Sequence, residues 1–302
     1  MPPLARRDVR SLVRKLGADA RPTQQAEALQ TITCLCWAAD ADCLVAIAAA
    51  GAIPALIQLL RSVSRPEVQQ DAATALGILA QNAQNVATIA GAIPALVQML
   101  GPGSTRNIQQ TAVNVLWLLA ENAYNQVAIA AAGAIPLLVL LLGPASPSVL
   151  KHNAAATLGH LAKNADNKVA IAGAIPVLVQ LLEPSSPLGV QNNAAAALVH
   201  LDVNADNKVT IAAAGAIPLM VQLLRPGSEA HQNAAAVLGS LAENTDNKVS
   251  IAGAGAIPLL VQLLGPSSPA MVQQVAAAVL DLLDCSAENH AAIAAARRGI
   301  RA

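Results

Sequence analysis

Histidine and cysteine are the residues of this chain best able to carry out chemistry, because both can bind metals and both can take part in catalysis. Three cysteines lie close together at Cys34, Cys36 and Cys43, while His160 and His200 stand at equivalent positions of a repeat. Two ligands of one zinc ion must each lie about 2.1 Å from it, whereas packed neighbouring helices have axes about 8–10 Å apart. We therefore expect no metal site and interpret the two histidines as uncharged surface groups.

Catalytic motifs are not found either. No serine, cysteine or histidine stands in a nucleophile motif, and the glycines form neither a GxGxxG sequence nor a P-loop. The sequence therefore predicts a protein that is not an enzyme and has no cofactor. Four cysteines in 302 residues do not suggest a disulfide framework, so we expect reduced thiols and a cytoplasmic or nucleocytoplasmic location.

Charge and hydropathy narrow the class of partner. The chain has 18 basic and 18 acidic residues, giving a formal net charge of zero, so we expect no binding to nucleic acid. The longest apolar run, residues 127–142, approaches the length of a membrane span. Gly133 and Pro136 interrupt it, which favours two packed helices joined by a corner. We expect no membrane insertion.

The positions of these side chains depend on an internal repeat. The tetrapeptide Gly-Ala-Ile-Pro begins at Gly51, Gly91, Gly133, Gly173, Gly215 and Gly255, with spacings of 40, 42, 40, 42 and 40 residues. Periods of this length are typical of helical arrays in which each unit packs only on its neighbours. We therefore predict one all-α solenoid over residues 1–302, with partial units at both ends. Its cycles are approximately 7–50, 51–90, 91–132, 133–172, 173–214, 215–254 and 255–296.

Each cycle is predicted to form three helices. In one cycle these are a short helix over 166–172, a medium helix over 176–182 and a longer helix over 189–201. Asp166 or Asn167 is expected to cap the first helix, and Gly173 is expected to end it in the left-handed conformation. Pro176 then stands in the first turn of the second helix, where its missing N–H is harmless.

The repeat resembles the armadillo family. The pattern AGAIPxLVxLL followed by NAAAxLxxL carries the likeness, and Asp166 to Pro176 is closest to plant and algal arrays such as U-box-associated and vacuolar armadillo proteins. The resemblance covers nearly the whole chain. It implies a right-handed α-α superhelix of about seven three-helix repeats, whose third helices line a concave groove that binds partners in extended form.

Helical spacing places candidate groove residues independently of that resemblance. Ala154, Ala155 and Leu158 share one apolar face, so Asn153 and His160 should lie on the opposite, exposed face. Transferring this register to other cycles gives the candidate partner-binding residues Asn114, Asn153, His160, Asn193, His200 and Asn233. The asparagines can pair with an extended backbone, or they can bond to neighbouring segments or simply face water.

We interpret the chain as a non-catalytic scaffold that binds other proteins or extended peptides, and is a monomer with weak self-association through its ends. One alternative is the substrate-recognition array of a ubiquitin-ligase system. Another is a nuclear-transport adaptor, which the resemblance disfavours because import adaptors carry asparagine and tryptophan in two groove columns that lack this pattern here. A purely architectural array that self-associates is a further alternative.

Overall fold

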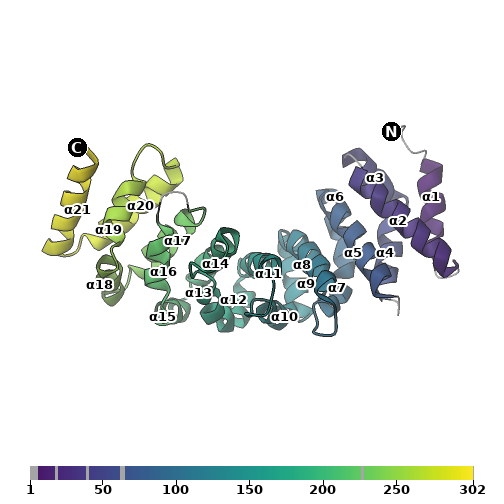
Figure 1. The fold of residues 1–302 in the computed structure, drawn as a ribbon, viewed down its shortest axis with the longest axis horizontal. Coiled ribbons are helices and arrows are strands. Elements are labelled where there is room, and N and C mark those ends of the chain that lie inside the picture. The colour runs from purple at the N-terminus through teal and green to yellow at the C-terminus, as the bar shows by residue number, and fades with distance from the viewer. Residues whose placement is uncertain (1–5, 18–19, 39–40, 62–64, 226–227, 302) are drawn as a thin grey trace. The chain divides into compact units, whose positions relative to one another are not determined.

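The computed structural model describes residues 6–17, 20–38, 41–61, 65–225 and 228–301. Within these ranges the chain forms helices and no β-strand, which confirms the all-α prediction. Its contacts divide it into two compact units, residues 1–141 and 142–302. Figure 1 labels the helices of both units. The single continuous superhelix over residues 1–302 stays a prediction.

The first unit contains three long third helices, of which α2 packs on α5 and α5 packs on α8. Medium helices α4 and α7 pack on α5 and α8, respectively. The elements of this unit are α1 (Arg6–Arg14), α2 (Pro22–Ala38), α3 (Ala41–Ala49), α4 (Ala52–Arg61), α5 (Pro66–Ala80), α6 (Ala83–Ile89), η1 (Ala90–Ala92), α7 (Ile93–Met99), α8 (Arg106–Ala120), α9 (Ala123–Ala131) and α10 (Ala134–Leu141).

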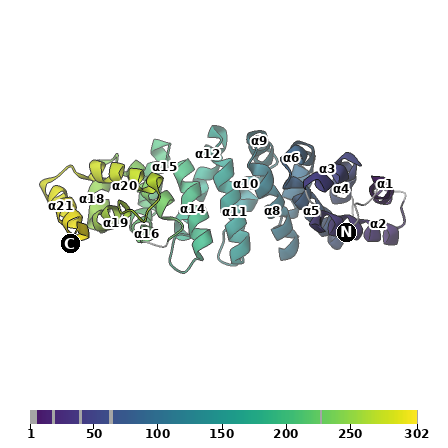
Figure 2. The ribbon, with the colours of Figure 1, turned by 90° about the horizontal axis from the view of Figure 1, so that it is seen from above.

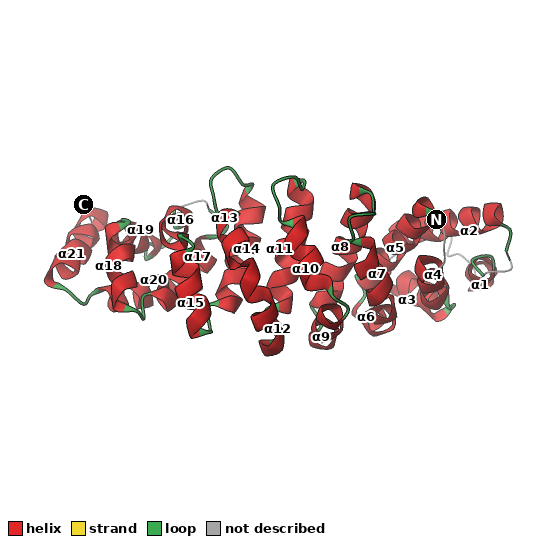
Figure 3. Cartoon of the chain, turned by 90° about the horizontal axis from the view of Figure 1, so that it is seen from below, coloured by secondary structure: helices red, strands yellow, loops and turns green. Residues whose placement is uncertain are grey.

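The second unit repeats the same order, and its third helices α11, α14, α17 and α20 pack on one another in sequence. Figure 2 shows α11 and α14 side by side, and Figure 3 shows the loops before these two helices at the edge of the unit away from α12 and α15. The elements are α11 (Ser148–Leu161), α12 (Ala165–Ile171), η2 (Ala172–Ala174), α13 (Ile175–Gln180), α14 (Leu188–Leu201), α15 (Ala205–Ala213), α16 (Ala216–Leu223), α17 (His231–Leu241), α18 (Thr245–Gly253), α19 (Ala256–Leu263), α20 (Ala270–Leu283) and α21 (Ala287–Arg301).

Burial along the third helices follows the predicted period. In α11 the side chains of Ala154, Ala155 and Leu158 are 0% exposed, because they occupy the stripe that packs against neighbouring helices. Small residues allow close approach: a Cβ added at Gly159 would lie 3.5 Å from Cα of Ala197 in α14. Alanine and glycine therefore set the tight packing of α11 on α14.

The corner between the first and second helices occurs in two forms. Gly51, Gly133, Gly215 and Gly255 adopt positive φ angles of 91°, 83°, 83° and 83°, the left-handed conformation that ends a helix without steric cost in glycine. The prediction that Gly173 does the same is wrong. Its corner is two residues shorter, and the chain passes through the 3₁₀ turn η2 instead, as it does through η1 at Gly91.

The corner between a third helix and the next first helix depends on asparagine. The predicted caps Asp166 and Asn167 are wrong, because Asn164 is the N-cap and its side chain accepts hydrogen bonds from the backbone N–H groups of both. Asn167 has another role: its buried Nδ2 donates to the carbonyl oxygen of Leu161 at 3.2 Å. The Asn164 side chain thus satisfies unpaired N–H donors at the start of α12, and the Asn167 side chain satisfies an unpaired carbonyl acceptor at the end of α11.

Helix length and the bends between helices determine whether any segment could span a membrane. No single helix in the described ranges is both long and apolar enough to cross a bilayer. Two consecutive helix pairs reach that length and hydrophobicity only when taken together, and they bend by 67° between α3 and α4 and by 87° between α9 and α10.

The two corner types predict opposite effects of the same substitution. Gly215→Ala should lower the free energy of unfolding by about 1 kcal/mol, because alanine is strained at positive φ. Gly173→Ala should be neutral or stabilising by up to about 1 kcal/mol, because its corner is not left-handed. A Cβ at either position would meet nothing within 4 Å, so urea denaturation of the pair isolates the backbone effect. Equal destabilisation of both variants would contradict it.

Candidate functional site

The outward side of α11, α14 and α17 forms the candidate site, which we call the third-helix face. It has three levels along the helices, each occupied by equivalent residues of successive repeats. All nine side chains are partly exposed, in contrast to the buried stripe behind them. The levels are Asn153, Asn193 and Asn233; Ala156, Ala196 and Ala236; and His160, His200 and Ser240.

The asparagine level connects the repeats. Nδ2 of Asn193 donates to the carbonyl oxygen of His152 at 3.0 Å, and Nδ2 of Asn233 donates to Oδ1 of Asn192 at 3.0 Å. Each bond joins one third helix to the preceding one. For Asn193 and Asn233 the structure shows a bond to a neighbouring segment, one of the roles that the sequence left open. Each bond uses one of the two N–H donors of the amide, so a partner would meet the Oδ1 acceptor and the second N–H of each side chain.

The middle level is a floor of small side chains. Ala156, Ala196 and Ala236 project only a methyl group from their helices, and each is partly exposed. Polar residues stand at the levels before and after them. This arrangement leaves a shallow surface that a peptide backbone could approach without displacing large side chains.

The histidine level carries the basic groups of the face. The Lys163 ammonium donates to Nδ1 of His160 at 3.2 Å, which requires an imidazole whose Nδ1 is unprotonated, because lysine has only donors. Burial lowers the pKa of His200 below its usual value, and the positive charges of Lys163 and Lys168, and of His160 when it is protonated, lower it further. Both findings agree with the interpretation of these histidines as uncharged.

Asp202 is a functional candidate that the sequence analysis missed. It directly follows α14 and is 5% exposed, whereas the equivalent residues of the adjacent repeats are Ala162 and Ala242. Burial raises the pKa of its carboxyl to about 6. The Ser240 hydroxyl donates to its backbone oxygen at 3.4 Å. An acidic residue at a position where neighbouring repeats have alanine was the signal in the sequence.

The remaining candidate, Asn114, lies in the first unit. It is exposed on α8, on the same side of its helix as the corresponding asparagine-level residue, Thr111. The structure therefore places Asn153, His160, Asn193, His200 and Asn233 on one face of the second unit, and it places Asn114 on the equivalent face of the first.

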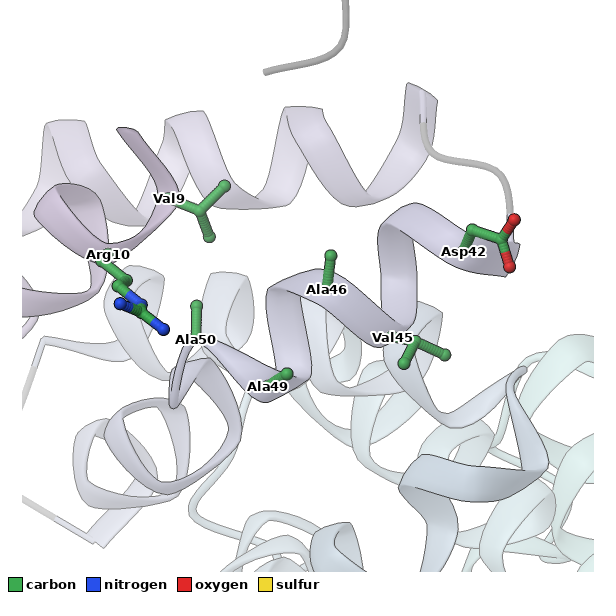
Figure 4. Close-up of a pocket in the computed structure, with 7 residues that line it drawn as sticks. All are labelled: Val9, Arg10, Asp42, Val45, Ala46, Ala49 and Ala50. Atoms are coloured by element: carbon green, nitrogen blue, oxygen red, sulfur yellow. The ribbon is translucent and has the colours of Figure 1, made fainter. Parts of the chain in front are cut away.

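A hollow of about 480 Å³ lies between α1 and α3 in the first unit (Figure 4). Alanine and valine side chains make up most of its wall, with one basic and one acidic residue at its margin. Its lining residues are Val9, Arg10, Asp42, Val45, Ala46, Ala49 and Ala50. A second hollow of about 490 Å³ lies beside the loop between α13 and α14. Neither hollow contains converging catalytic groups.

In the described ranges, the four cysteines and the possible metal-binding side chains show no sign of a reactive centre. Cys34, Cys36, Cys43 and Cys285 form no disulfide bond. Burial raises the pKa of Cys36 to about 12, so this thiol is a poor nucleophile at neutral pH. No three His, Cys, Asp or Glu side chains among the described residues are grouped so that they could hold a metal ion.

Helices stacked in short, medium and long order, with a partly exposed face on the longest, define a helical repeat protein. The armadillo/β-catenin-like repeat model matches residues 40–81, 164–201 and 244–280. An engineered protein solved by the Northeast Structural Genomics Consortium is 32% identical over 96% of this chain and 71% of its own, with a TM-score of 0.83. A designed armadillo repeat protein is 24% identical over 91% of this chain and 100% of its own, with a TM-score of 0.55, and shows the fold alone.

The chain belongs to the armadillo-repeat family. This confirms the family resemblance inferred from the sequence. No curated protein matches the chain with significant similarity, and the likeness to plant and algal arrays stays a prediction. The armadillo fold is typically a non-catalytic scaffold for protein interactions.

The buried carboxyl of Asp202 predicts an unusual dependence of stability on pH. Because its pKa is raised on folding, from 3.8 to about 6, the folded state holds a proton that the unfolded state releases between these values. The free energy of unfolding should therefore fall as pH rises through this window. Asp202→Ala should be more stable than wild type at pH 7 by about 1–3 kcal/mol, and the difference should shrink towards pH 4.

Urea denaturation at the two pH values checks this, with Asp202→Asn as a second variant that keeps the side-chain shape. A wild type that is more stable than both variants at pH 7 would show that the carboxylate is stabilising and that the inferred sign is wrong.

Proposed function

We propose that the chain is a non-catalytic scaffold that binds an extended peptide segment of a partner protein on the third-helix face of its second unit. One observation carries the proposal. The same three positions of α11, α14 and α17 are partly exposed and small or polar, while the opposite side of each helix is buried. The family's typical role as an interaction scaffold supports the same function.

The spacing of the face suits an extended chain. Packed helices have axes about 8–10 Å apart, and two residues of an extended strand span about 7 Å. A bound peptide could therefore present alternate residues to successive repeats, over the alanines of the middle level. Its backbone N–H groups would meet the Oδ1 acceptors of Asn193 and Asn233, each of which uses one of its two N–H donors to bond the preceding helix.

The proposal assigns Asn153, His160, Asn193, His200 and Asn233 to the contact surface, with Asn114 at the equivalent place in the first unit. It includes a cytoplasmic or nucleocytoplasmic location, which suits four cysteines that form no disulfide bond. No specific observation favours a ubiquitin-ligase or nuclear-transport role over a general binding module.

Filling the alanine floor tests this function. Peptides that bind the full chain would first be selected from a random display library, and their affinities for variants would then be measured by calorimetry. Ala196→Arg should weaken binding at least about tenfold, or about 1.4 kcal/mol, because its long side chain would occupy the middle level. The matched control is Val209→Arg on α15, where the native side chain is 67% exposed and off this face.

Circular dichroism would confirm that both variants keep their helices. Selected peptides that bind Ala196→Arg as tightly as wild type, but lose affinity for Val209→Arg, would place the binding surface on the first helices and refute the proposal.

A further inference from the structure

We propose that His160, Lys163, Lys168 and His200 form a subsite for an anionic group, the carboxylate or phosphate of a residue in the bound partner peptide. The inference deepens the proposed function and rests on it. It concerns one end of the third-helix face, where α11 and α14 finish and α12 begins. It predicts a partner segment that is acidic or phosphorylated at one position.

The four side chains belong to one region because α11 packs closely on α14, and Lys163, Lys168 and His160 are all near enough to His200 to act on its charge. Gly159 of α11 lies against Ala197 of α14, where an added Cβ would be 3.5 Å from the Ala197 Cα atom. His160 directly follows this glycine, and His200 is one helical turn after the alanine. The Lys163 ammonium is held at 3.2 Å from Nδ1 of His160, so one cation is already fixed beside the pair.

Lys168 is the second cation of the subsite, and its counterpart in the next repeat is Lys208. Lys208 of α15 forms an ion pair with Glu243, the second residue after the end of α17, with a separation of 2.5 Å. Lys168 of α12 is the equivalent lysine one repeat earlier, and Val203 stands where the glutamate would be. Lys168 therefore lies at the end of α14 without the glutamate that neutralises its counterpart.

The charges that act on His200 are consequently of one sign. Lys163, Lys168 and His160 all disfavour its protonated form and lower its pKa, together with burial. The acidic side chain nearest in sequence is Asp202, which is 5% exposed and whose pKa is raised by burial to about 6. At pH 7 its carboxylate offsets part of the Lys168 charge, while Lys208 and Glu243 also act on it. Lys163 is exposed and does not act on Asp202, so the exposed end of this cluster keeps a positive charge that an external anion can offset.

The hydrogen-bond donors of the lysines and histidines also favour an anionic ligand. An ammonium group offers donors only, and a neutral imidazole whose Nδ1 accepts from lysine carries its proton on Nε2. A carboxylate or phosphate has only acceptors at neutral pH and forms stronger hydrogen bonds with charged donors than neutral groups do. A basic ligand residue would instead meet two like charges, so an acidic position in the peptide is the complementary choice.

The test uses acetyl-pentaglutamate amide as the probe, with the full chain, at pH 7 and about 50 mM salt so that surface charges are only moderately screened. Histidine ring resonances would be followed by NMR, and affinity by calorimetry. Binding should shift the His160 and His200 resonances and raise the pKa of His200, because a nearby anion favours the protonated imidazole. A pentaglutamine peptide should not bind.

Two substitutions and one matched control give the test its specificity. The double variant Lys163→Gln/Lys168→Gln should lose at least about tenfold in affinity for the probe, or about 1.4 kcal/mol, because it removes both charged hydrogen-bond donors. Lys248→Gln removes the equivalent lysine of α18, which is partly exposed and away from the histidine pair, and it should change affinity by less than about twofold. A phosphoserine peptide of the same length distinguishes a carboxylate from a phosphate ligand. Binding of either peptide should depend on Lys163 and Lys168, and the peptide that binds more tightly identifies the preferred anion.

The inference is overturned if the probe leaves both histidine resonances unmoved, or if Lys248→Gln weakens binding as much as the double variant does. These outcomes are independent of the scaffold function. Display-selected peptides that still require Ala196 but ignore both lysines would remove the anion subsite and leave the proposed function standing. Peptides that ignore Ala196 would remove the proposed function itself.

Discussion

The pairing of asparagines at the corners after α5, α8, α11, α14 and α17 is the constraint on which these repeats depend. A third helix ends in the interior, where its last carbonyl groups cannot reach water, and the next helix starts beside it with free N–H groups. Asn204 accepts from two such N–H groups, and Asn207 donates to the carbonyl of Leu201 at 3.0 Å. The pairs at 122 and 125, 164 and 167, and 244 and 247 form the same bonds. In the pair at 82 and 85, Asn82 accepts from the N–H of Gln84, and Asn85 donates to the carbonyl of Leu79. Without them, the long helices would leave buried polar groups unsatisfied.

These fixed corners determine which side of a third helix is exposed. Once a helix leaves its corner in one orientation, Leu158 must face the neighbouring helices and Ala156 must face outward. The sequence predicted this division because the helical period reflects packing that recurs in every repeat. The short, medium and long helices over 165–171, 175–180 and 188–201 were likewise predicted to within two residues at each end.

Features that depend on single contacts were not predictable in this way. The glycine of the Gly-Ala-Ile-Pro sequence looks the same at Gly173 and Gly215, but only the longer corner needs the left-handed conformation. The periodicity placed Asn193 on the exposed face, yet it could not reveal that the Nδ2 atom reaches His152 in the preceding helix. The burial of Asp202 was missed because alanine occupies the equivalent positions of the adjacent repeats, 162 and 242. A pattern inferred from all the repeats does not show such a single exception.

The two forms of the first corner also have a consequence for how such a chain can change. A left-handed glycine at 215 and a 3₁₀ turn at 172–174 both lead into a helix that begins with Ala-Ile-Pro or Ile-Pro. Units that differ by two residues therefore present the same buried surfaces to their neighbours. Unequal recombination between repeats could add, remove or exchange whole units without requiring a new interface, so the length of the array can vary while its packing is preserved.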